Sequence, residues 1–284
     1  MTQADKQYNE LVKNILENGV LDENPRPVYK DGTSAHSRFI TDIYSKYSEN
    51  ITPIISIRPI AWRTGIREIL TIYQKQTNNI REMEDMGVGW WSDWTVNPDD
   101  VPELHNIGLR YGATVKKWNL MNKLLDGLVN EPFSRRHIIN LYQESDLQET
   151  DGLHPCAFLT EWSCRRAKDG KMYLDMSLTQ RSSDFGTAYS INQIQYKALQ
   201  MMVACHCGYE VGTFSHHVMN LHIYDRHEEQ LKILRDTVGQ ENEPELILVL
   251  PKNTNFYDIN VDDFKMMNYA PVKHRDKLIF ELAI

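Results

Sequence analysis

The sequence is short of cysteine, of long hydrophobic runs and of basic residues, and each shortage excludes a class of protein. Four cysteines among 284 residues are too few for a disulfide scaffold. The longest aliphatic run, residues 246–250, is too short to span a bilayer. Residues 1–19 carry Lys6, Glu10 and Lys13 and lack the continuous apolar segment of a signal peptide. We therefore predict a reduced, cytoplasmic protein that does not cross a membrane.

The net charge is −8, from 31 basic and 39 acidic residues. A chain of this charge repels nucleic acid and anionic membranes as a whole, so nucleic acid is not expected as its main ligand. A small anionic substrate can still bind where Arg and Lys side chains gather. Hydrophobic residues make up 41% of the chain, which is enough for one large core or two small ones.

Hydrophobic spacing and turn residues predict a chain that contains both helices and strands. The predicted helices are 8–19, 62–74, 119–128 and 196–208, and the predicted strands are 51–60, 137–142, 157–166, 171–179, 245–251 and 278–282. Residues 86–118 are aromatic, glycine-rich and irregular, as in a binding surface. Because no repeat or linker divides the chain, we predict one α+β domain over residues 1–284.

A cysteine and an arginine are predicted to meet across a hairpin. Cys156 lies 25 positions before Arg181, and the two predicted strands between them are joined by a turn at residues 168–171. A neighbouring guanidinium favours the thiolate, which is the nucleophilic form of cysteine. A lone cysteine is more often a small buried apolar residue. We predict the active site at this pair.

Two other clusters of metal-ligand residue types are better explained by packing. Cys205-His206-Cys207 has no second ligand pair of matching type and falls within an apolar helical pattern, so core packing is favoured over zinc. His216-His217 lacks the context of a metalloprotease helix and is predicted to be structural. Nothing local supports a papain-like protease, and we expect no metal.

Arg135 and Arg136 follow Ser134 just before a predicted strand. Guanidinium groups match phosphate oxygens in a bidentate way. Adjacent side chains on an extended segment point to opposite sides, so one site can use both only at a loop or a subunit boundary. From the residues alone, phosphate binding and a solvated surface pair remain equally open.

These motifs, taken together, resemble the thymidylate synthase family. The matching strings are Ser134-Arg135-Arg136, Pro155-Cys156, Gln180-Arg181-Ser182 followed by Asp184, Asn192, Leu221-His222-Ile223-Tyr224, Trp91 with Trp94, Tyr111-Gly112, Glu68 before Ile69-Leu70, and the terminal Ala283-Ile284. They run in the family's order to the last residue, and the ordered set is far more specific than any one string. The resemblance implies an α+β fold in which a large mixed β-sheet is packed with helices and uses one face as a dimer interface.

The resemblance also implies a reaction, the reductive methylation of dUMP to dTMP. The family uses 5,10-methylenetetrahydrofolate as carbon donor and reductant, without a metal. Cys156 would add to uracil C6, and Arg181 would lower the pKa of its thiol. Glu68 would move protons through water at O4, and Tyr111 would assist loss of the C5 proton. Asn192 would donate to O4 and accept from N3–H.

The same resemblance implies the binding residues of a homodimer. For the nucleotide they are Arg26 or Lys30, Gln180, Arg181, Ser182, Asp184, Asn192, His222 and Tyr224, with Arg135 and Arg136 entering the site of the partner subunit. For the folate they are Arg58, Trp91, Trp94, Asp184, Ala283 and Ile284.

Three departures from the family pattern leave alternatives open. The family's arginine before the Gly32-Thr33 pair is replaced by Lys30 or displaced to Arg26, and the sequence does not decide between them. Ala157 follows the cysteine where many members have histidine, and residues 188–191 differ near the folate.

These departures permit a second reaction. If water captures the methylene intermediate, the enzyme is a dUMP hydroxymethylase that makes 5-hydroxymethyl-dUMP and tetrahydrofolate. A non-catalytic interaction protein is disfavoured, because Cys156, Arg181, Asn192 and Glu68 are all present.

Overall fold

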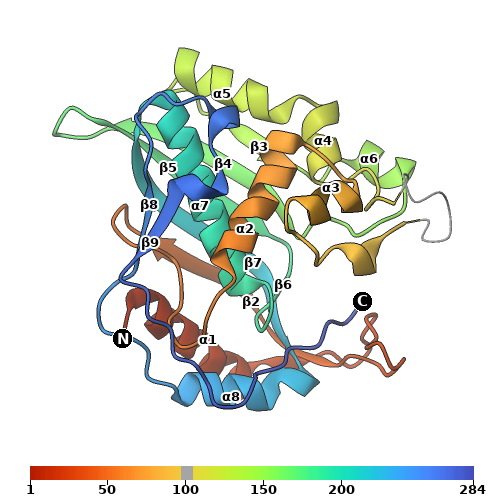
Figure 1. The fold of residues 1–284 in the computed structure, drawn as a ribbon. Coiled ribbons are helices and arrows are strands. Elements are labelled where there is room, and N and C mark those ends of the chain that lie inside the picture. Colours follow the sequence, from red (N-terminus) through yellow and green to blue (C-terminus); the bar gives the residue numbers. More distant parts are fainter. Residues whose placement is uncertain (97–104) are drawn as a thin grey trace.

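The computed structural model describes residues 1–96 and 105–284 of the chain, which build helices around a large mixed β-sheet (Figure 1). The sheet contains β1 (Val20–Leu21), β2 (Ser37–Tyr47), β3 (Ile138–Asn140), β4 (Ala157–Arg166), β5 (Met172–Gln180), β6 (Ser183–Asp184) and β7 (Glu210–Tyr224). Its order is β1-β2-β7-β5-β4-β3, and β6 pairs with β7. β7 runs parallel to β5 and β6, while the other pairs are antiparallel. A separate two-stranded sheet joins β8 (Glu245–Leu248) to β9 (Phe264–Met267).

The helices pack on this sheet and at its ends. They are α1 (Gln3–Asn18), α2 (Trp62–Ile69), α3 (Ile80–Asp85), α4 (Gly112–Lys117), α5 (Leu120–Asn130), α6 (Glu144–Glu149), α7 (Tyr189–Cys207) and α8 (Glu228–Asp236). A stretch of π-helix, Leu70–Lys75, continues α2. None of the helices in the described part of the chain is both long enough and apolar enough to cross a membrane.

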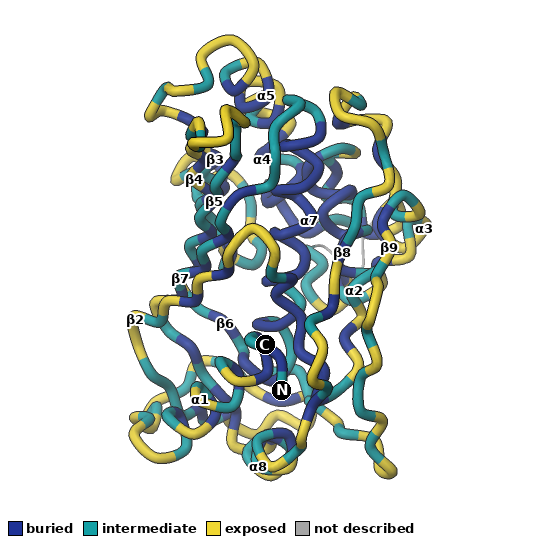
Figure 2. Tube along the Cα trace, turned by 90° about the vertical axis from the view of Figure 1, so that its left-hand side faces the viewer, coloured by how far each residue is buried: buried dark blue, intermediate teal, exposed yellow. Residues whose placement is uncertain are grey.

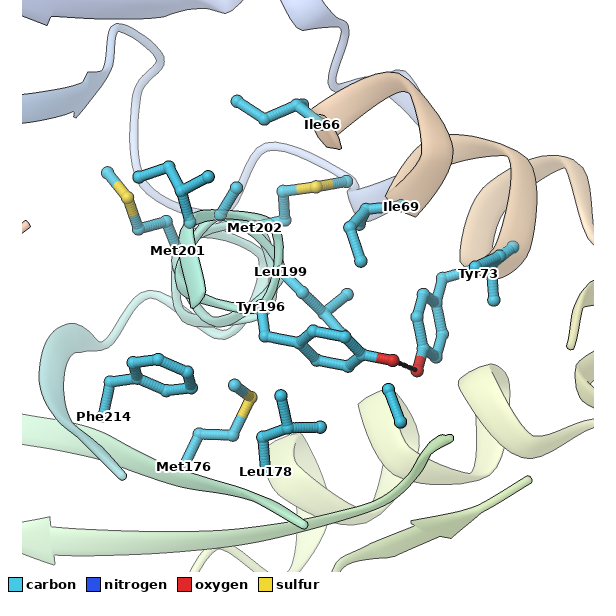
Figure 3. Close-up of a cluster of buried hydrophobic side chains, with 14 of the residues drawn as sticks. Ile66, Ile69, Tyr73, Met176, Leu178, Tyr196, Leu199, Met201, Met202 and Phe214 are labelled. Atoms are coloured by element: carbon cyan, nitrogen blue, oxygen red, sulfur yellow. Dashed lines mark hydrogen bonds between the residues drawn. The ribbon is translucent and has the colours of Figure 1, made fainter. Parts of the chain in front are cut away.

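Helix α7 forms the centre of the core between α2 and the sheet. Nearly all of its residues are buried, and it is dark along its length in Figure 2. Figure 3 shows its residues Tyr196 and Leu199 between Ile69 of α2 and Leu178 of β5. Each large apolar side chain buried here contributes roughly 1.5–3 kcal/mol. The core therefore fixes the start of α7 against the ends of β5 and β7.

The strand alternation explains which face of the sheet is covered. Leu174, Met176 and Leu178 of β5 are buried, and the residues between them are only partly buried. On the opposite face, Tyr44 of β2 is 70% exposed and stacks on His217 of β7. The prediction of an α+β fold with a large mixed sheet is confirmed.

Two predicted strands do not form. Residues 51–60 lie outside any strand and bend at 56–58, and Ile54 and Ile55 are fully buried. The apolar residues of this segment are explained by burial in the core. Its backbone is bonded to a side chain and not to a strand, since the N–H of Ser56 donates to the Asp5 carboxylate at 2.7 Å. Residues 278–282 are also outside any strand, because this tail is held by separate contacts.

The two longest strands, β2 and β7, were not predicted. Asp42 in the middle of β2 has a φ of 59°, which interrupts the alternation that a sequence pattern depends on. In β7, His216-His217 and neighbouring polar residues hide an otherwise regular alternation of buried positions. The predicted helices, the β4–β5 hairpin and the strands near 137–142 and 245–251 are confirmed, although α7 begins at Tyr189 and not at the predicted residue 196. Of the irregular stretch 86–118, residues 97–104 lie outside the described part.

The buried carboxylate of Asp5 connects α1 to the segment 51–60. Its two oxygens accept from the N–H and the hydroxyl of Ser56, at 2.7 and 2.6 Å. We expect Asp5→Ala to lower the free energy of unfolding by about 2–3 kcal/mol, because it leaves buried donors without an acceptor. Urea denaturation measures this change. Glu17→Ala, at an exposed position of the same helix, is the control, and equal losses in the two variants would contradict the assignment.

Candidate active site

A cavity of about 950 Å³ opens where β4, β5 and β7 meet the first turn of α7. Segments distant in the sequence line it: Arg26, Glu68, Trp90, Trp91, Trp94, Tyr111, Cys156, Ala157, Gln180, Arg181, Ser182, Asp184, Asn192, Gln195, His222, Tyr224, Ala283 and Ile284. Most of the residues predicted from the motifs are thus brought together. Lys30, Arg58, Arg135 and Arg136 do not line the cavity.

The β4–β5 hairpin brings Arg181 beside Cys156. Ala157 pairs with Gln180, and the N–H of Arg181 donates to the carbonyl of Cys156 at 3.0 Å. The guanidinium Nη2 lies 3.3 Å from the Cys156 sulfur and 2.7 Å from the carbonyl oxygen of His154. The predicted proximity of the two side chains is confirmed. The same NH₂ group therefore contacts both the sulfur and a backbone carbonyl, which positions the guanidinium at the sulfur.

The net pKa of the Cys156 thiol differs from the expectation. Burial raises it above its ordinary value, and the positive charges of Arg181 and Arg26 offset only part of that effect. Arg181 acts in the predicted direction, but desolvation of the thiolate outweighs it. In the ligand-free protein the thiol is therefore mainly protonated near neutral pH.

Tyr111 supports the backbone at the nucleophile. Its hydroxyl oxygen accepts from the N–H of Cys156 at 3.2 Å, and its ring lies against Trp91 with centroids 5.1 Å apart. Burial raises the pKa of Tyr111, so it remains a neutral hydroxyl. Gly112 is required next to it, since a Cβ there would lie 2.2 Å from the carbonyl oxygen of Thr77.

A chain of hydrogen bonds crosses the floor of the cavity. His216 Nε2 contacts Gln180 Oε1 at 2.5 Å, and Gln180 Nε2 donates to Asn192 Oδ1 at 3.1 Å. Asn192 Nδ2 donates to Gln195 Oε1 at 2.7 Å, and Gln195 Nε2 donates to Glu68 Oε2. Burial lowers the pKa of His216 to about 3, so its ring is neutral. These hydrogen bonds link the predicted residues Gln180, Asn192 and Glu68 to one another.

Glu68 is a buried carboxyl group surrounded by N–H donors. Trp90 Nε1 donates to its Oε1 at 3.0 Å, and Trp91 Nε1 and Gln195 Nε2 donate as well. Burial raises the pKa of Glu68, and these three donors lower it in part. A carboxyl group with a raised pKa can exchange protons near neutral pH.

Sequence reasoning missed Gln195 and Trp90. Gln195 follows Asn192 by one helical turn, and this (i, i+3) spacing is the signal that could have located it. Trp90 directly precedes Trp91, and adjacent tryptophans in an irregular segment pointed to the same surface.

Part of the cavity wall carries positive charge. Arg26, Arg181 and Ser182 line it. Lys30 lies outside, with its exposed ammonium 3.3 Å from Asp93. The geometry therefore favours Arg26 over Lys30 as a ligand for an anion. The nearby His222 ring contacts Asn220 Oδ1 at 3.1 Å.

The aromatic side of the cavity contains Trp91 and Trp94, with ring centroids 5.7 Å apart. Asp184 also lines the cavity, and it accepts from the N–H of Gly186 and the hydroxyl of Thr187 at 2.9 and 2.7 Å. Burial alone would raise the pKa of Asp184, but hydrogen bonding and the charges of nearby histidines give a net lowering. This carboxylate is therefore ionised and can accept N–H groups of a ligand.

Arg58 lies behind the C-terminal tail and not on the cavity wall. It donates to the carbonyl of Gly186 at 2.5 Å and stacks on the ring of Phe280, 4.6 Å from its centroid. The tail itself reaches the cavity through Ala283 and Ile284. Ile284 forms two backbone hydrogen bonds with Val28, so the C-terminus lies beside the N-terminal loop in Figure 1.

Arg135 and Arg136 line a separate hollow formed by residues 131–136. Neither residue lines the cavity around Cys156. Cys205 and His206 on α7 contact the 251–256 segment: the Cys205 thiol reaches the carbonyl of Pro251, and His206 Nδ1 accepts from the N–H of Phe256 at 3.1 Å. Among the described residues, no group of three His, Cys, Asp or Glu side chains could hold a metal ion.

Comparisons with known proteins agree in one family. The family model described as thymidylate synthase matches residues 6–283. Thymidylate synthases from Lactococcus lactis subsp. cremoris and Streptococcus sanguinis are each 46% identical over 287 residues, and the match covers 100% of both chains. The solved structure of the thermostable thymidylate synthase A from Bacillus subtilis superposes with a TM-score of 0.86 at 35% identity, covering 100% of each chain.

The raised pKa of Cys156 predicts how its reactivity depends on pH. Since alkylation requires the thiolate, labelling of Cys156 by iodoacetamide in the free protein should still be rising at pH 9. Arg181→Met should displace the curve to higher pH, because it removes a charge that lowers this pKa. Peptide mass spectrometry measures the label at each cysteine. A plateau below pH 8 would contradict the dominance of burial.

Proposed function

The chain belongs to the thymidylate synthase family, and on this premise we propose that it methylates dUMP to dTMP with 5,10-methylenetetrahydrofolate as carbon donor and reductant. The observation that carries the proposal is the 3.3 Å contact between Cys156 and Arg181 in a cavity that also holds Asn192 and Glu68. These groups suit addition of sulfur to a pyrimidine. Full-length identity of 46% to proteins named thymidylate synthase supports the same activity.

Cys156 supplies the nucleophile in this mechanism. Its sulfur bonds to C6 of uracil, the C5–C6 double bond opens, and the electron pair is delocalised over C5 and O4. Arg181 stabilises the thiolate before the attack and after its release. Because uracil C5 is a weak nucleophile without this adduct, all later bond formation at C5 depends on Cys156.

Charge that develops at O4 is met by two residues. Asn192 donates an N–H to O4 and accepts from N3–H, and Glu68 exchanges a proton with O4 through water. Tyr111, held at Cys156, is placed to assist removal of the C5 proton. Ala157 provides no polar group beside the cysteine, so Glu68 and its donors carry this part of the proton transfer.

The remaining predicted residues fit the two substrates. The phosphate lies against Arg26, Arg181 and Ser182, and the deoxyribose against His222 and Tyr224. Gln180 supports the base through Asn192. A flat pterin with amino groups fits between the tryptophan rings and the carboxylate of Asp184, and the folate supplies the one-carbon unit and the hydride when bound. Trp91, Trp94, Asp184, Ala283 and Ile284 hold it, with Arg58 behind the tail.

We also propose a homodimer in which Arg135 and Arg136 reach the phosphate in the partner's site. Their hollow lies apart from the cavity of their own subunit, which explains why both arginines stand together on a surface loop. Tyr44 and Met219 expose apolar surface on the open face of the sheet, 70% and 50%. Residues 1–284 form one catalytic domain in this proposal, and the enzyme acts in the cytoplasm.

Hydroxymethylation is the less favoured reaction. The relatives that match the full chain are named thymidylate synthases, and the tail residues Ala283 and Ile284 line the cavity, where they would help to exclude water once the substrates are bound. A dry pocket favours hydride over water as the group that captures the methylene intermediate.

The products decide between the two reactions. The wild-type protein incubated with dUMP and methylenetetrahydrofolate should give dTMP and dihydrofolate in equal amounts by mass spectrometry, whereas 5-hydroxymethyl-dUMP with tetrahydrofolate would refute methylation. Cys156→Ala should lower turnover by at least about 10⁴-fold while retaining dUMP binding. Cys164→Ala, a buried cysteine outside the cavity, is the matched control and should keep its activity.

Mixed dimers test the shared site. Arg136→Ala should weaken dUMP binding severely, and Cys156→Ala removes the nucleophile. After unfolding and refolding an equal mixture, half of the dimers carry one intact site, so activity should recover to about one quarter of the wild-type value. Steady-state assays measure the recovery. If the mixture stays as inactive as its components, the arginines do not act across the interface.

A further inference from the structure

Gln195 is a buried side chain on α7 that joins Asn192 to Glu68. It is 1% exposed, and it lies one helical turn after Asn192. Its Oε1 accepts from Asn192 Nδ2 at 2.7 Å, and its Nε2 donates to Glu68 Oε2. Both ends of its amide are therefore engaged, and neither faces solvent.

The carboxylate at the end of this chain determines the direction of each hydrogen bond. An ionised carboxylate only accepts, so the NH₂ of Gln195 must face Glu68 and its carbonyl must face Asn192. Asn192 must then turn its NH₂ toward Gln195 and its carbonyl toward the NH₂ of Gln180. His216 closes the chain by donating Nε2–H to the carbonyl of Gln180. The oxygen and nitrogen of an amide cannot be told apart by shape alone, but this series of hydrogen bonds assigns them.

We propose that Gln195 is a positioning residue that gives the enzyme its preference for uracil over cytosine by holding the amide of Asn192 in one orientation. The inference rests on the proposed function. In this orientation Asn192 keeps one free N–H on the Glu68 side and one free lone pair on the Gln180 side. Uracil offers the matching pair, with O4 as acceptor and N3–H as donor. Cytosine offers the reverse pair, which fits only a flipped amide.

Gln195 also acts on the proton chemistry of Glu68. Burial raises the pKa of this carboxyl group, while the donors Trp90, Gln195 and Trp91 lower it. The titratable groups that face Glu68 from neighbouring elements are Tyr111 before α4 and Tyr196 on α7, and burial keeps both neutral. Loss of the donor at position 195 raises the pKa of Glu68 further. The ionised form then appears only at higher pH.

Gln195→Met tests the inference, because methionine has nearly the same length and cannot form either hydrogen bond. The ratio of the dCMP to the dUMP dissociation constant, measured by calorimetry, should fall by at least about tenfold. The acid limb of the kcat profile should move up by about one pH unit. Gln200→Met is the matched control, since Gln200 is a buried amide of the same helix that donates to the backbone carbonyls of Leu174 and Thr213. The Gln200→Met substitution should lower the free energy of unfolding and leave both the ratio of dissociation constants and the kcat profile unchanged.

Gln195→Glu separates the two effects and serves if the methionine variant does not fold. A carboxyl group at this position still accepts from Asn192, so the preference for dUMP should persist. The new carboxyl group also shares a proton with Glu68. The acid limb of the kcat profile should therefore move to a higher pH than in Gln195→Met. Loss of the preference in this variant would overturn the inference.

The outcomes also distinguish a failure of this inference from a failure of the proposed function, the methylation of dUMP. A wild-type protein that binds dCMP as tightly as dUMP would overturn both. Wild-type preference for dUMP together with an unchanged ratio and pH profile in folded Gln195→Met would overturn only the role of Gln195.

Discussion

The register of the β4–β5 hairpin places the guanidinium of Arg181 3.3 Å from the sulfur of Cys156, and the rest of the cavity is arranged around that contact. A shift of one residue would turn Arg181 to the other face of the sheet and remove it from the sulfur. The register is held on the buried face, where Met176 and Leu178 pack against α7. The hydrophobic core and the reactive pair are therefore consequences of the same alternation.

Burial gives the cavity its chemical character and also opposes its reactivity. Desolvation raises the pKa of Cys156, Glu68 and Tyr111, so each of these groups is less readily charged than in water. Different groups lower each pKa again. Guanidinium groups lower the pKa of the Cys156 thiol, and indole and amide N–H groups lower that of the Glu68 carboxyl. Groups whose charged form is disfavoured by burial can exchange protons when charge develops on a bound pyrimidine.

Most of the site residues predicted from the sequence line one cavity, because short strings carry them. Cys156, Arg181 and Asn192 line one cavity, as the hairpin and the motif order predicted, since both depend on local spacing. The net pKa of Cys156 was not predictable, because it depends on how many atoms from other segments surround the sulfur. Gln195 was missed for a related reason: its partner Glu68 lies 127 residues away, and its (i, i+3) spacing from Asn192 was the only local signal.

The fold shows the same limit. Helix α7 and the β4–β5 hairpin have regular patterns and were predicted, whereas β2 contains the positive φ of Asp42 and β7 contains paired histidines. Residues 51–60 have the composition of a strand but bury their isoleucines without a partner strand. Whether an extended segment pairs is decided by the rest of the molecule.

The most direct test of the central claim is the mass of the protein after incubation with 5-fluoro-dUMP and methylenetetrahydrofolate. Fluorine cannot leave C5 as a proton does, so the bond from sulfur to C6 should persist. The account predicts a stable adduct of one nucleotide and one folate, located by peptide mapping at Cys156. A protein that turns over dUMP but shows no adduct, or an adduct at another cysteine, would contradict it.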